Sequence, residues 1–357
     1  MTGVSRQALF SGAEAPPAHL ALDSQRLDAW LRSHLDFYRG PLEIEKFRGG
    51  QSNPTYRLTT PAARYVLRKK PPGPLLPSAH SIDREYRVIA ALHAAGFPVP
   101  RPYLLCDDES VVGTMFYLVE HVDGRVFWEV DLPGVSPGER SAIYDSMNAT
   151  LAALHSIDPL ALGLGDFGRP GNYLQRQFDR WTKQYRAAQL ADVPDMDWLI
   201  AELPGRIPES SASRLVHGDY GLHNIVIHKT EPQVAAVLDW EISTLGDPLG
   251  DIGHHLTAWH LPPDLERGSV SSLVGCDLAV LGIPTADAYL DRYLERTGAA
   301  DFDRRFVLGF GLFRYAAIIQ GVMKRAQSGT GANQNMMHTQ ARVGLLAAAA
   351  RRTIEGR

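Results

Sequence analysis

The sequence predicts an α+β protein with two lobes, a small antiparallel-sheet N-lobe followed by a larger, mainly helical C-lobe. Three observations support this prediction. Short strand-like runs dominate up to about residue 122, with one strongly amphipathic helix among them. From residue 123 onward, apolar residues recur mostly at helical spacing. The length of 357 residues is sufficient for a hydrophobic core in each lobe.

The chain divides into three predicted parts. These are a flexible N-terminal arm at 1–20, an N-lobe at 21–122 and a C-lobe at 123–357. The N-lobe opens with "DSQRLDAWLRSHL", where leucines recur at helical spacing behind Asp23 or Ser24 as the N-cap. We therefore expect ordered structure to begin near residue 23.

Short strands and a second helix make up the rest of the N-lobe. "IEKFRGGQSNPTYRLTT" contains two strand-like runs around a Gly-Gly turn, and "YVLR" is a third run. After a proline-rich stretch, "SIDREYRVIAALHAAG" places Ile82, Ile89 and Leu92 on one helix face, with Gly96 as C-cap. "RPYLLCDD" and "MFYLVEHVDG" complete a small sheet that one helix covers.

Helices dominate the predicted C-lobe. "RSAIYDSMNATLAALHSI", "FDRRFVLGFGLFRYAAIIQGVMKRAQ" and "QARVGLLAAAARR" all have helical patterns. Between the first two lies "RLVHGDYGLHNIVIH", a strand, a polar turn and a second strand, and "VAAVLDWE" supplies another strand. Arg314 and Lys324 on the long helix are interpreted as parts of a solvated face.

Composition excludes several classes of function. The formal net charge is -4 and no basic block is interleaved with aromatics, so neither nucleic acid nor an anionic membrane is an expected partner. Cys106 and Cys276 form no CxxC pattern, so they predict no disulfide framework or thiolate metal site. The N-terminus is a poor secretory signal, and no run of about 18 apolar residues occurs. We expect a cytoplasmic protein.

The polar turn and the strand after it carry the residues that phosphoryl transfer from a nucleotide requires. Asp219 follows a strand, where its carboxylate can accept the proton of a substrate hydroxyl. Asn224, five residues later, offers an amide oxygen to Mg²⁺, and Asp239 offers a carboxylate at the end of the next strand. Glu241 can assist through a second metal or a water. These residues predict a general base beside a magnesium site.

The motifs "HGDYGLHN", "VLDWE" and "LGDPLGDI", in this order, resemble those of the aminoglycoside phosphotransferase-like kinases, which are relatives of the protein kinases. "YVLRKKPPG", "REYRVIAAL" and "LDWEISTLGDPLGD" are most similar to the branch fused to, or encoded near, acyl-CoA dehydrogenases. The resemblance covers about Leu27 to about Gln327. It implies a two-lobed protein-kinase-like fold with ATP and Mg²⁺ bound between the lobes.

The resemblance also implies nucleotide-binding roles for residues of the N-lobe. The loop over the phosphates would consist of Gly49, Gly50, Gln51, Ser52 and Asn53, with backbone N–H groups facing the anion. Arg68 would hold the phosphates and Glu85 would pair with it. Glu120 to Val122 would form the hinge, where backbone groups bond adenine.

In the C-lobe, the resemblance implies that Asp219 is the catalytic base and that Asn224 and Asp239 are the metal ligands. His217 would support the loop. Asp247 and Asp251, in "GDPLGDIG", are interpreted as helix-capping and loop-bracing groups.

Three features depart from the pattern of the kinases. Arg68 occupies the position of the expected Lys, with Lys69 and Lys70 adjacent. Arg keeps a permanent charge and a two-pronged fork, so phosphate binding survives, but the geometry differs. The glycine-rich loop has two glycines plus Pro54. The metal motif is Asp-Trp-Glu, and no long activation segment ending in Ala-Pro-Glu follows it. The metal motif and the missing segment favour a small-molecule acceptor over a protein.

Several alternatives remain open at this point. The acceptor is a small-molecule hydroxyl, with a hydroxyacyl-CoA, an aminoglycoside, a choline-type compound or a sugar as candidates. A nucleotide-binding pseudokinase that acts as a scaffold is the second hypothesis, and Arg68 is its main support. The histidines of "GHHLTAWH", His254, His255 and His260, match no HExxH pattern and are interpreted as ordinary core or surface residues. The sequence does not predict an oligomeric state.

Overall fold

A computed structural model describes residues 6–49, 53–71, 81–209, 213–262, 271–327 and 340–357. The chain has a protein-kinase-like fold of mixed helix and antiparallel sheet, and it forms two compact units. Unit 1 consists of Met1–Trp128 and Leu222–Ile242, and unit 2 of Glu129–Gly221 and Ser243–Arg357. Residues 222–242, which the sequence-based division assigns to the C-lobe, therefore belong to the sheet-containing unit.

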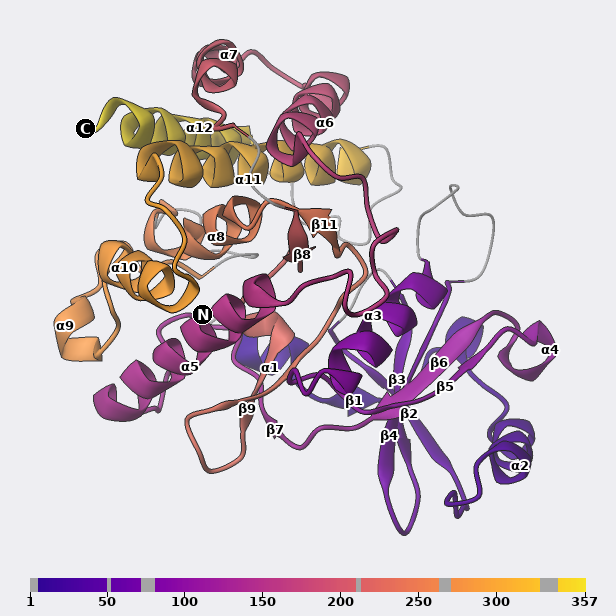
Figure 1. Cartoon of the computed structure of the whole chain (residues 1–357). Coiled ribbons are helices and arrows are strands. Elements are labelled where there is room, and N and C mark those ends of the chain that lie inside the picture. The colour runs from indigo at the N-terminus through magenta and orange to yellow at the C-terminus, as the bar shows by residue number, and fades with distance from the viewer. Residues whose placement is uncertain (1–5, 50–52, 72–80, 210–212, 263–270, 328–339) are drawn as a thin grey trace, which may run out of the picture. The chain divides into compact units, whose positions relative to one another are not determined.

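An antiparallel sheet with strand order β1-β2-β3-β4-β6-β5 is the centre of unit 1 (Figure 1). Its strands are β1 (Ala13–Glu14), β2 (Glu43–Phe47), β3 (Thr55–Thr59), β4 (Arg64–Lys69), β5 (Pro102–Cys106) and β6 (Phe116–Glu120). Because side chains alternate between the two faces of a strand, Leu67 and Leu118 point to one face while Arg68 and Tyr117 point to the other.

A helix covers each face of this sheet. On one face, Leu27 and Leu31 of α2 (Ser24–His34) join a buried cluster with Leu67 and Leu118. The predicted cap is confirmed, since the carboxylate of Asp23 accepts the Arg26 N–H at 3.0 Å. On the other face lies α3 (Ile82–Ala94), which ends before Gly96 with its positive φ of 76°. The alternation of β4 therefore directs Arg68 toward α3.

The segment expected to be a flexible arm has local structure from Arg6 onward. It contains α1 (Arg6–Phe10), β1 and the 3₁₀ turn η1 (Ala18–Leu20). β1 pairs with β2, and Gln7 Nε2 donates to the Val126 carbonyl at 2.8 Å. These elements are too short to produce a periodic pattern in the sequence, and contacts with distant residues hold them in place.

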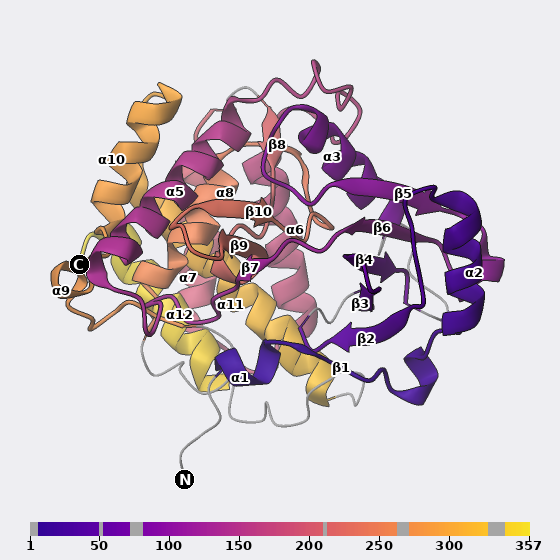
Figure 2. The same ribbon diagram turned by 90° about the horizontal axis from the view of Figure 1, so that it is seen from below.

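A three-stranded sheet with the order β10-β9-β7 brings the late segment into unit 1 (Figure 2). Its strands are β7 (Gly124–Arg125), β9 (Ile225–His228) and β10 (Val234–Val237), with the 3₁₀ turn η3 (Leu222–Asn224) before β9. A Cβ at Gly124 would lie 2.3 Å from the Ile227 carbonyl oxygen, so this close pairing requires glycine. The short helix α4 (Glu109–Val112) completes unit 1.

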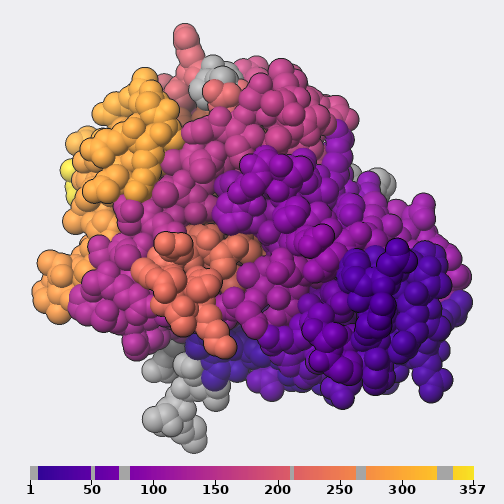
Figure 3. Space-filling model, turned by 60° about the horizontal axis from the view of Figure 1, so that its bottom comes forward, coloured from indigo at the N-terminus to yellow at the C-terminus, as the bar shows by residue number. Residues whose placement is uncertain are grey.

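Unit 2 is mainly helical. Its helices are α5 (Pro137–Ser156), α6 (Tyr173–Ala188), α7 (Pro194–Glu202), α8 (Leu249–His255), α9 (Leu278–Leu281), α10 (Ala286–Thr297), α11 (Arg304–Gln327) and α12 (Gln340–Glu355). The 3₁₀ turns η2 (Leu203–Arg206) and η4 (Leu256–Trp259) follow α7 and α8, and the strands β8 (Arg214–Val216) and β11 (Thr244–Gly246) pair with each other. The space-filling view shows α9 and α10 in orange against α5 in magenta (Figure 3).

The long helix α11 is the core helix of unit 2. Within the described residues it is long and apolar enough to cross a membrane, with a mean hydropathy of 1.6, but 78% of its apolar window is buried inside the protein. Packing inside the fold therefore accounts for its apolar composition. A Cβ at Gly311 would lie 2.2 Å from the Gly253 carbonyl oxygen, so α11 and α8 approach each other closely where both carry glycine.

Candidate functional site

Asp251 fixes the backbone of the loop that carries Asp219 in unit 2. This carboxylate is completely buried, and it accepts the His217 N–H and the Gly218 N–H, both at 2.7 Å. Hydrogen bonds from N–H groups to an ionised carboxylate are short and strong. The predicted loop-bracing role of Asp251 is confirmed. Asp247 caps the start of α8, where it accepts the Leu249 N–H at 3.0 Å.

A second layer of side chains holds Asp251 itself. His155 Nε2 lies 3.2 Å from Asp251 Oδ2, and His155 Nδ1 lies 2.8 Å from the Tyr293 hydroxyl. Burial raises the pKa of Asp251, but the hydrogen bonds from His155 and from the His217 N–H outweigh it, so the pKa lies below its ordinary value. Asp251 therefore stays ionised and keeps its two backbone bonds.

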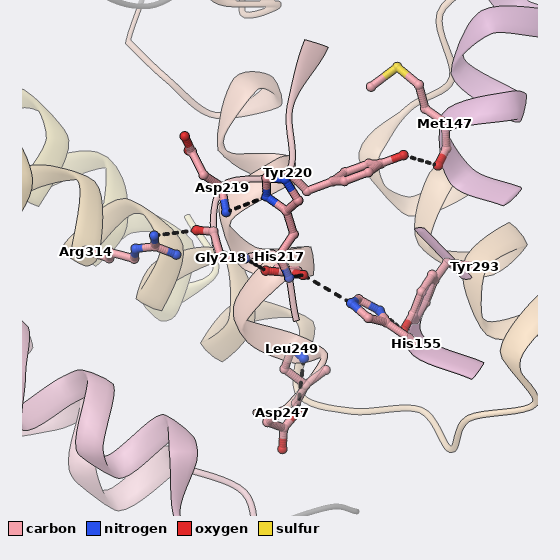
Figure 4. Close-up of polar contacts among 11 residues, drawn as sticks. Met147, His155, His217, Gly218, Asp219, Tyr220, Asp247, Leu249, Tyr293 and Arg314 are labelled. Carbon is pink, nitrogen blue, oxygen red and sulfur yellow. Dashed lines mark hydrogen bonds and ion pairs between the residues drawn. The ribbon is translucent and has the colours of Figure 1, made fainter. Parts of the chain in front are cut away.

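Arg314 holds the same loop from the opposite side (Figure 4). Its Nη2 donates to the Gly218 carbonyl oxygen at 2.6 Å, and its guanidinium lies 5.4 Å from the centre of the Trp181 ring. The interpretation of Arg314 as part of a solvated face is wrong, because the residue is only 8% exposed. α11 is surrounded by other helices, and this polar position on it faces the loop. Tyr220 anchors the far end of the loop by donating to the Met147 carbonyl at 2.8 Å.

Two histidines contact Asp219. The Asp219 N–H donates to His217 Nδ1 at 3.1 Å, which agrees with the supporting role expected for His217. His254 Nε2 lies 2.8 Å from Asp219 Oδ1. The sequence interpretation of His254 as an ordinary core or surface residue missed this contact. A signal was present, since His254 follows Asp251 by three residues and so lies on the same face of α8.

In unit 1, Arg68 lies among three carboxylates. Arg68 Nε is 3.1 Å from Glu85 Oε2, so the expected pair is present. Arg68 Nη2 is 2.7 Å from Asp239 Oδ1 and 2.8 Å from Glu241 Oε2. Arg68 is 7% exposed and Glu85 is 1% exposed. We call Arg68, Glu85, Asp239 and Glu241 the unit 1 cluster.

The unit 1 cluster carries an excess of negative charge. When all three carboxylates are ionised, their charges and that of the one guanidinium give a formal sum of −2. Burial raises the pKa of Glu85, Arg68 lowers it and the charges of Asp239 and Glu241 raise it, and the net result is a pKa of about 7. A divalent cation at this position would offset the excess charge, which fits the expected Mg²⁺.

Asn224 and Asp239 lie at neighbouring points of the backbone in unit 1. The Leu238 N–H donates to the Asn224 carbonyl oxygen at 2.8 Å, so the residue before Asp239 is bonded to Asn224. Asp239 has a positive φ of 64°, a left-handed conformation that few non-glycine residues adopt and that Asp adopts more readily than most. Asn53 Nδ2 also donates to Glu241 Oε2 at 3.1 Å.

The available oxygen atoms suit a hard cation. Asp239 and Glu241 have carboxylates with side-chain exposures of 28% and 22%, and the amide oxygen expected to join them is that of Asn224, whose backbone carbonyl is bonded to the Leu238 N–H. Within the described ranges, no group of three or more His, Cys, Asp or Glu residues could hold a metal ion. Phosphate oxygens and water would therefore complete the coordination shell, as is usual for Mg²⁺ beside a nucleotide.

The expected nucleotide-binding loop and hinge are described in part. Gly50, Gln51 and Ser52 lie outside the described residues, whereas a Cβ on Gly49 would lie 3.2 Å from the Trp128 ring.

At the hinge, the Glu120 N–H bonds the Arg101 carbonyl at 2.9 Å and the His121 N–H bonds the Arg64 carbonyl at 3.4 Å. The backbone of Val122 makes no hydrogen bond to any described residue. Among the expected hinge residues, Val122 is thus best suited to bond a base.

The site residues expected from the sequence fall into two groups. Unit 1 contains Asn53, Arg68, Glu85, Asn224 and Asp239, and the structure brings Arg68 into contact with Glu85 and Asp239. Asp219 belongs to unit 2.

Comparisons with known proteins identify the family of the chain and its fold. The model of the phosphotransferase enzyme family matches residues 43–310. A solved structure from Ralstonia eutropha, provisionally assigned as an aminoglycoside phosphotransferase, is 46% identical, with a TM-score of 0.83 over 94% of this chain and 99% of that chain. Spectinomycin phosphotransferase, solved with ADP and spectinomycin, has a TM-score of 0.60 over 93% of this chain and 98% of that chain, but is 12% identical and so shares the fold alone.

The curated relatives are longer proteins that are named as acyl-CoA dehydrogenase family members. Acyl-CoA dehydrogenase family member 10 of Mus musculus is 44% identical over 314 residues, which are 87% of this chain and 29% of that protein. Acyl-CoA dehydrogenase family member 11 of Homo sapiens is 43% identical over 336 residues, which are 90% of this chain and 42% of that protein. The chain therefore spans less than half the length of these relatives.

Proposed function

The chain belongs to the phosphotransferase enzyme family, and on this premise we propose that it transfers the γ-phosphate of ATP to a hydroxyl group of a small molecule. The observation that carries the proposal is the unit 1 cluster, in which three carboxylates exceed the charge of one arginine. Such a cluster favours a divalent cation, and Mg²⁺ is the cation that accompanies ATP in phosphoryl transfer.

Each residue of unit 1 has a role in this proposal. Asn224 and Asp239 hold Mg²⁺, which would draw negative charge away from the β- and γ-phosphates. Arg68 orients Asp239 and Glu241 and, through its permanent charge, attracts the phosphates. Glu85 fixes the position of Arg68. The backbone of Val122 bonds the base.

Asp219 in unit 2 accepts the proton of the acceptor hydroxyl. As the O–H bond breaks, the acceptor oxygen forms a bond to the γ-phosphorus and the bond to the bridging oxygen of ATP breaks, which releases ADP. The proton on Asp219 then returns to water. Asp251 and Arg314 hold the backbone on both sides of Gly218, which keeps the carboxylate of Asp219 in position.

The names of the relatives guide the choice of acceptor. The relatives are named acyl-CoA dehydrogenase family members. A hydroxyacyl group, presented as a CoA thioester, is therefore the acceptor that we propose to test first.

A screen for ADP formation tests the proposal. The purified protein is incubated with ATP and Mg²⁺ and with hydroxyacyl-CoAs, sugars, choline-type compounds or aminoglycosides. We expect acceptor-dependent ADP formation, with the phosphate recovered on the acceptor, and no product from Asp219→Asn. The absence of product with every acceptor, in a protein that binds ATP and Mg²⁺, would contradict the proposal.

One observation favours a second candidate, a pseudokinase scaffold that binds a nucleotide without turnover. Arg68 already contacts three carboxylates, whereas a phosphate-binding cation would have to share its charge with the nucleotide. A thermal-shift titration with ATP, with and without Mg²⁺, followed by the same screen separates the candidates. Binding without transfer to any acceptor would indicate the scaffold.

A further inference from the structure

Helix α8 reaches the loop of Asp219 with two side chains. Asp251 and His254 are three residues apart, so they lie on one face of this helix. Asp251 binds the backbone of the loop through the N–H groups of His217 and Gly218. His254 instead binds a side chain, that of Asp219, with 2.8 Å between Nε2 and Oδ1. One helix thus fixes both the backbone and the carboxylate.

The chemistry of the pair defines which atom donates. An ionised carboxylate only accepts hydrogen bonds, so Nε2 of His254 carries the hydrogen. This bond holds Oδ1 of the Asp219 carboxylate at 2.8 Å from the ring of His254. The side chain of Asp219 is 35% exposed while that of His254 is 12% exposed, so the carboxylate is the more accessible member of the pair.

The position of His254 is rigidly defined. Gly253, the residue before it, touches α11 so closely that a Cβ on Gly311 would lie 2.2 Å from the Gly253 carbonyl oxygen. α11 also carries Arg314, which binds the Gly218 carbonyl. Two charged side chains, Asp251 on α8 and Arg314 on α11, thus bind the backbone beside Asp219. A functional side chain held by packed helices is placed more accurately than one held by a loop alone.

We propose that His254 is a positioning residue for phosphoryl transfer, which holds the Asp219 carboxylate in a fixed orientation through the contact between Nε2 and Oδ1. This inference rests on the proposed function, because it assumes that Asp219 is the general base. His254 acts through Asp219 and does not contact the transferred phosphate. Its loss therefore affects the rate of the chemical step and not the binding of ATP.

Two variants of His254 separate a positioning role from a merely structural one. His254→Leu removes the donor and keeps much of the volume, whereas His254→Gln keeps an N–H donor near the place of Nε2. We expect His254→Leu to lower kcat roughly 10- to 100-fold, a part of what general-base catalysis contributes, with the KM for ATP unchanged. We expect His254→Gln to recover most of the loss. His93→Gln, at an exposed position of α3, is the control.

The kcat values of the two variants show whether His254 has a positioning role. A kcat for His254→Leu within about two-fold of the wild type would overturn the inference, because general-base positioning contributes far more than this. Equal losses in the Leu and Gln variants would also overturn it. The acceptor is the one found in the screen, or water in ATP hydrolysis if the screen returns none. A wild type that forms no ADP under either condition would contradict the proposed function instead.

A measurement without turnover tests the pair independently. In ¹⁵N-histidine-labelled protein, the resonance that disappears in His254→Gln belongs to His254. We expect its Nε2–H proton to be protected from exchange with solvent and to lose this protection in Asp219→Ala, because the acceptor is removed. An unchanged Nε2–H signal in Asp219→Ala would overturn the inference, even in a protein without detectable activity.

Discussion

The unit 1 cluster and the Asp219 loop of unit 2 hold their carboxylates in different ways. In unit 1, Glu85, Asp239 and Glu241 share one cation, Arg68, and negative charge remains in excess. In unit 2, Asp251 is matched by two backbone N–H groups and His155. The first arrangement is incomplete without a further cation, whereas the second is complete within the protein.

This difference assigns ligand binding to the unit 1 cluster and the positioning of the general base to the Asp219 loop. A site that must receive Mg²⁺ and a triphosphate keeps uncompensated charge for its ligand. A loop that presents a general base gains from being fixed before the substrate arrives, because catalysis favours groups that do not have to reorganise. Changes in the unit 1 cluster should therefore alter metal and nucleotide binding, and changes around Asp219 should alter the rate or the stability.

The largest expected effects come from Asp239→Asn and Asp219→Asn. Asp219→Asn should lower kcat by roughly 10²- to 10⁴-fold, the range that general acid–base catalysis typically contributes, and Asp239→Asn should also lower it strongly because a charged metal ligand is lost. They should differ in binding, since Asp239→Asn loses a charged metal ligand while Asp219→Asn leaves unit 1 intact. Calorimetric titration with Mg²⁺ and ATP measures this difference. Equal affinities of the two variants for Mg²⁺ and ATP would contradict the distinction between the two sites. A wild-type rate in either variant would refute the role assigned to that residue.

Asp251→Asn should have the next largest effect, and it should act on stability. The amide nitrogen of Asn cannot accept the backbone N–H that the lost carboxylate oxygen accepted, so the free energy of unfolding should fall by about 2–4 kcal/mol. Urea denaturation measures the change. Asp277→Asn is the control, because Asn replaces Asp equally well at this exposed N-cap of α9. Equal losses in both variants would contradict the account.

The pKa of Asp251 also predicts how this stability depends on pH. Because the folded-state pKa is depressed, the contribution of Asp251 is present above its unfolded-state pKa and is lost as the pH falls through the folded-state pKa. Acid denaturation of the wild type should therefore be steeper than that of Asp251→Asn.

Arg68→Lys should produce an intermediate effect. A lysine amine cannot reproduce the separate contacts of Nε with Glu85 and of Nη2 with Asp239 and Glu241. We expect the KM for ATP to rise roughly 5- to 10-fold, which corresponds to about 1 kcal/mol. Steady-state kinetics measures it. Arg57→Lys, in the more exposed pair with Glu45, should change little. An unchanged or higher activity of Arg68→Lys would show that the separate contacts of the Arg68 guanidinium have no role in ATP binding.

The smallest expected effect concerns pH and Glu85. Its pKa is raised to about 7, so Glu85 is neutral below this pH and becomes charged above it. The negative charge of the unit 1 cluster therefore increases as the pH rises through 7, and the affinity for Mg²⁺ should rise with it, by about 3- to 10-fold between pH 6 and 8. Glu85→Gln should remove this pH dependence. A wild-type affinity that is flat over this range would contradict the assignment.

Much of the fold was predictable because its elements have regular patterns. The leucines behind Asp23 predicted α2, the apolar face of "REYRVIAAL" predicted α3, and the long apolar run predicted α11. The short elements α1 and β1 within the segment 1–20 were not predicted, because they depend on contacts with distant residues rather than on periodicity. The assignment of residues 222–242 to unit 1 depends on the pairing of β9 with β7, which no local pattern reveals.

The candidate site was predictable where the chain keeps its charged residues in recognisable motifs. Arg68 and Glu85 are not neighbours in the sequence, and the resemblance to a kinase family predicted that they pair. In the structure, the alternation of side chains along β4 directs Arg68 toward Glu85 on α3. The contact of Arg314 was missed because a lone arginine on a helix has no sequence signal for its partner, and that of His254 was missed although its spacing from Asp251 places both on one face of α8. Their roles depend on how α8 and α11 face the loop, which only tertiary structure defines.

Hydrogen exchange with a non-hydrolysable ATP analogue and Mg²⁺ tests the central claim most directly. If the unit 1 cluster is completed by the ligand while the Asp219 loop is complete without it, amides around Asp239 should gain protection when ligand binds. Amides of His217 and Gly218, already bonded to Asp251, should change little. Protection that is independent of Mg²⁺, or that appears at His217 and Gly218 and not around Asp239, would contradict the account.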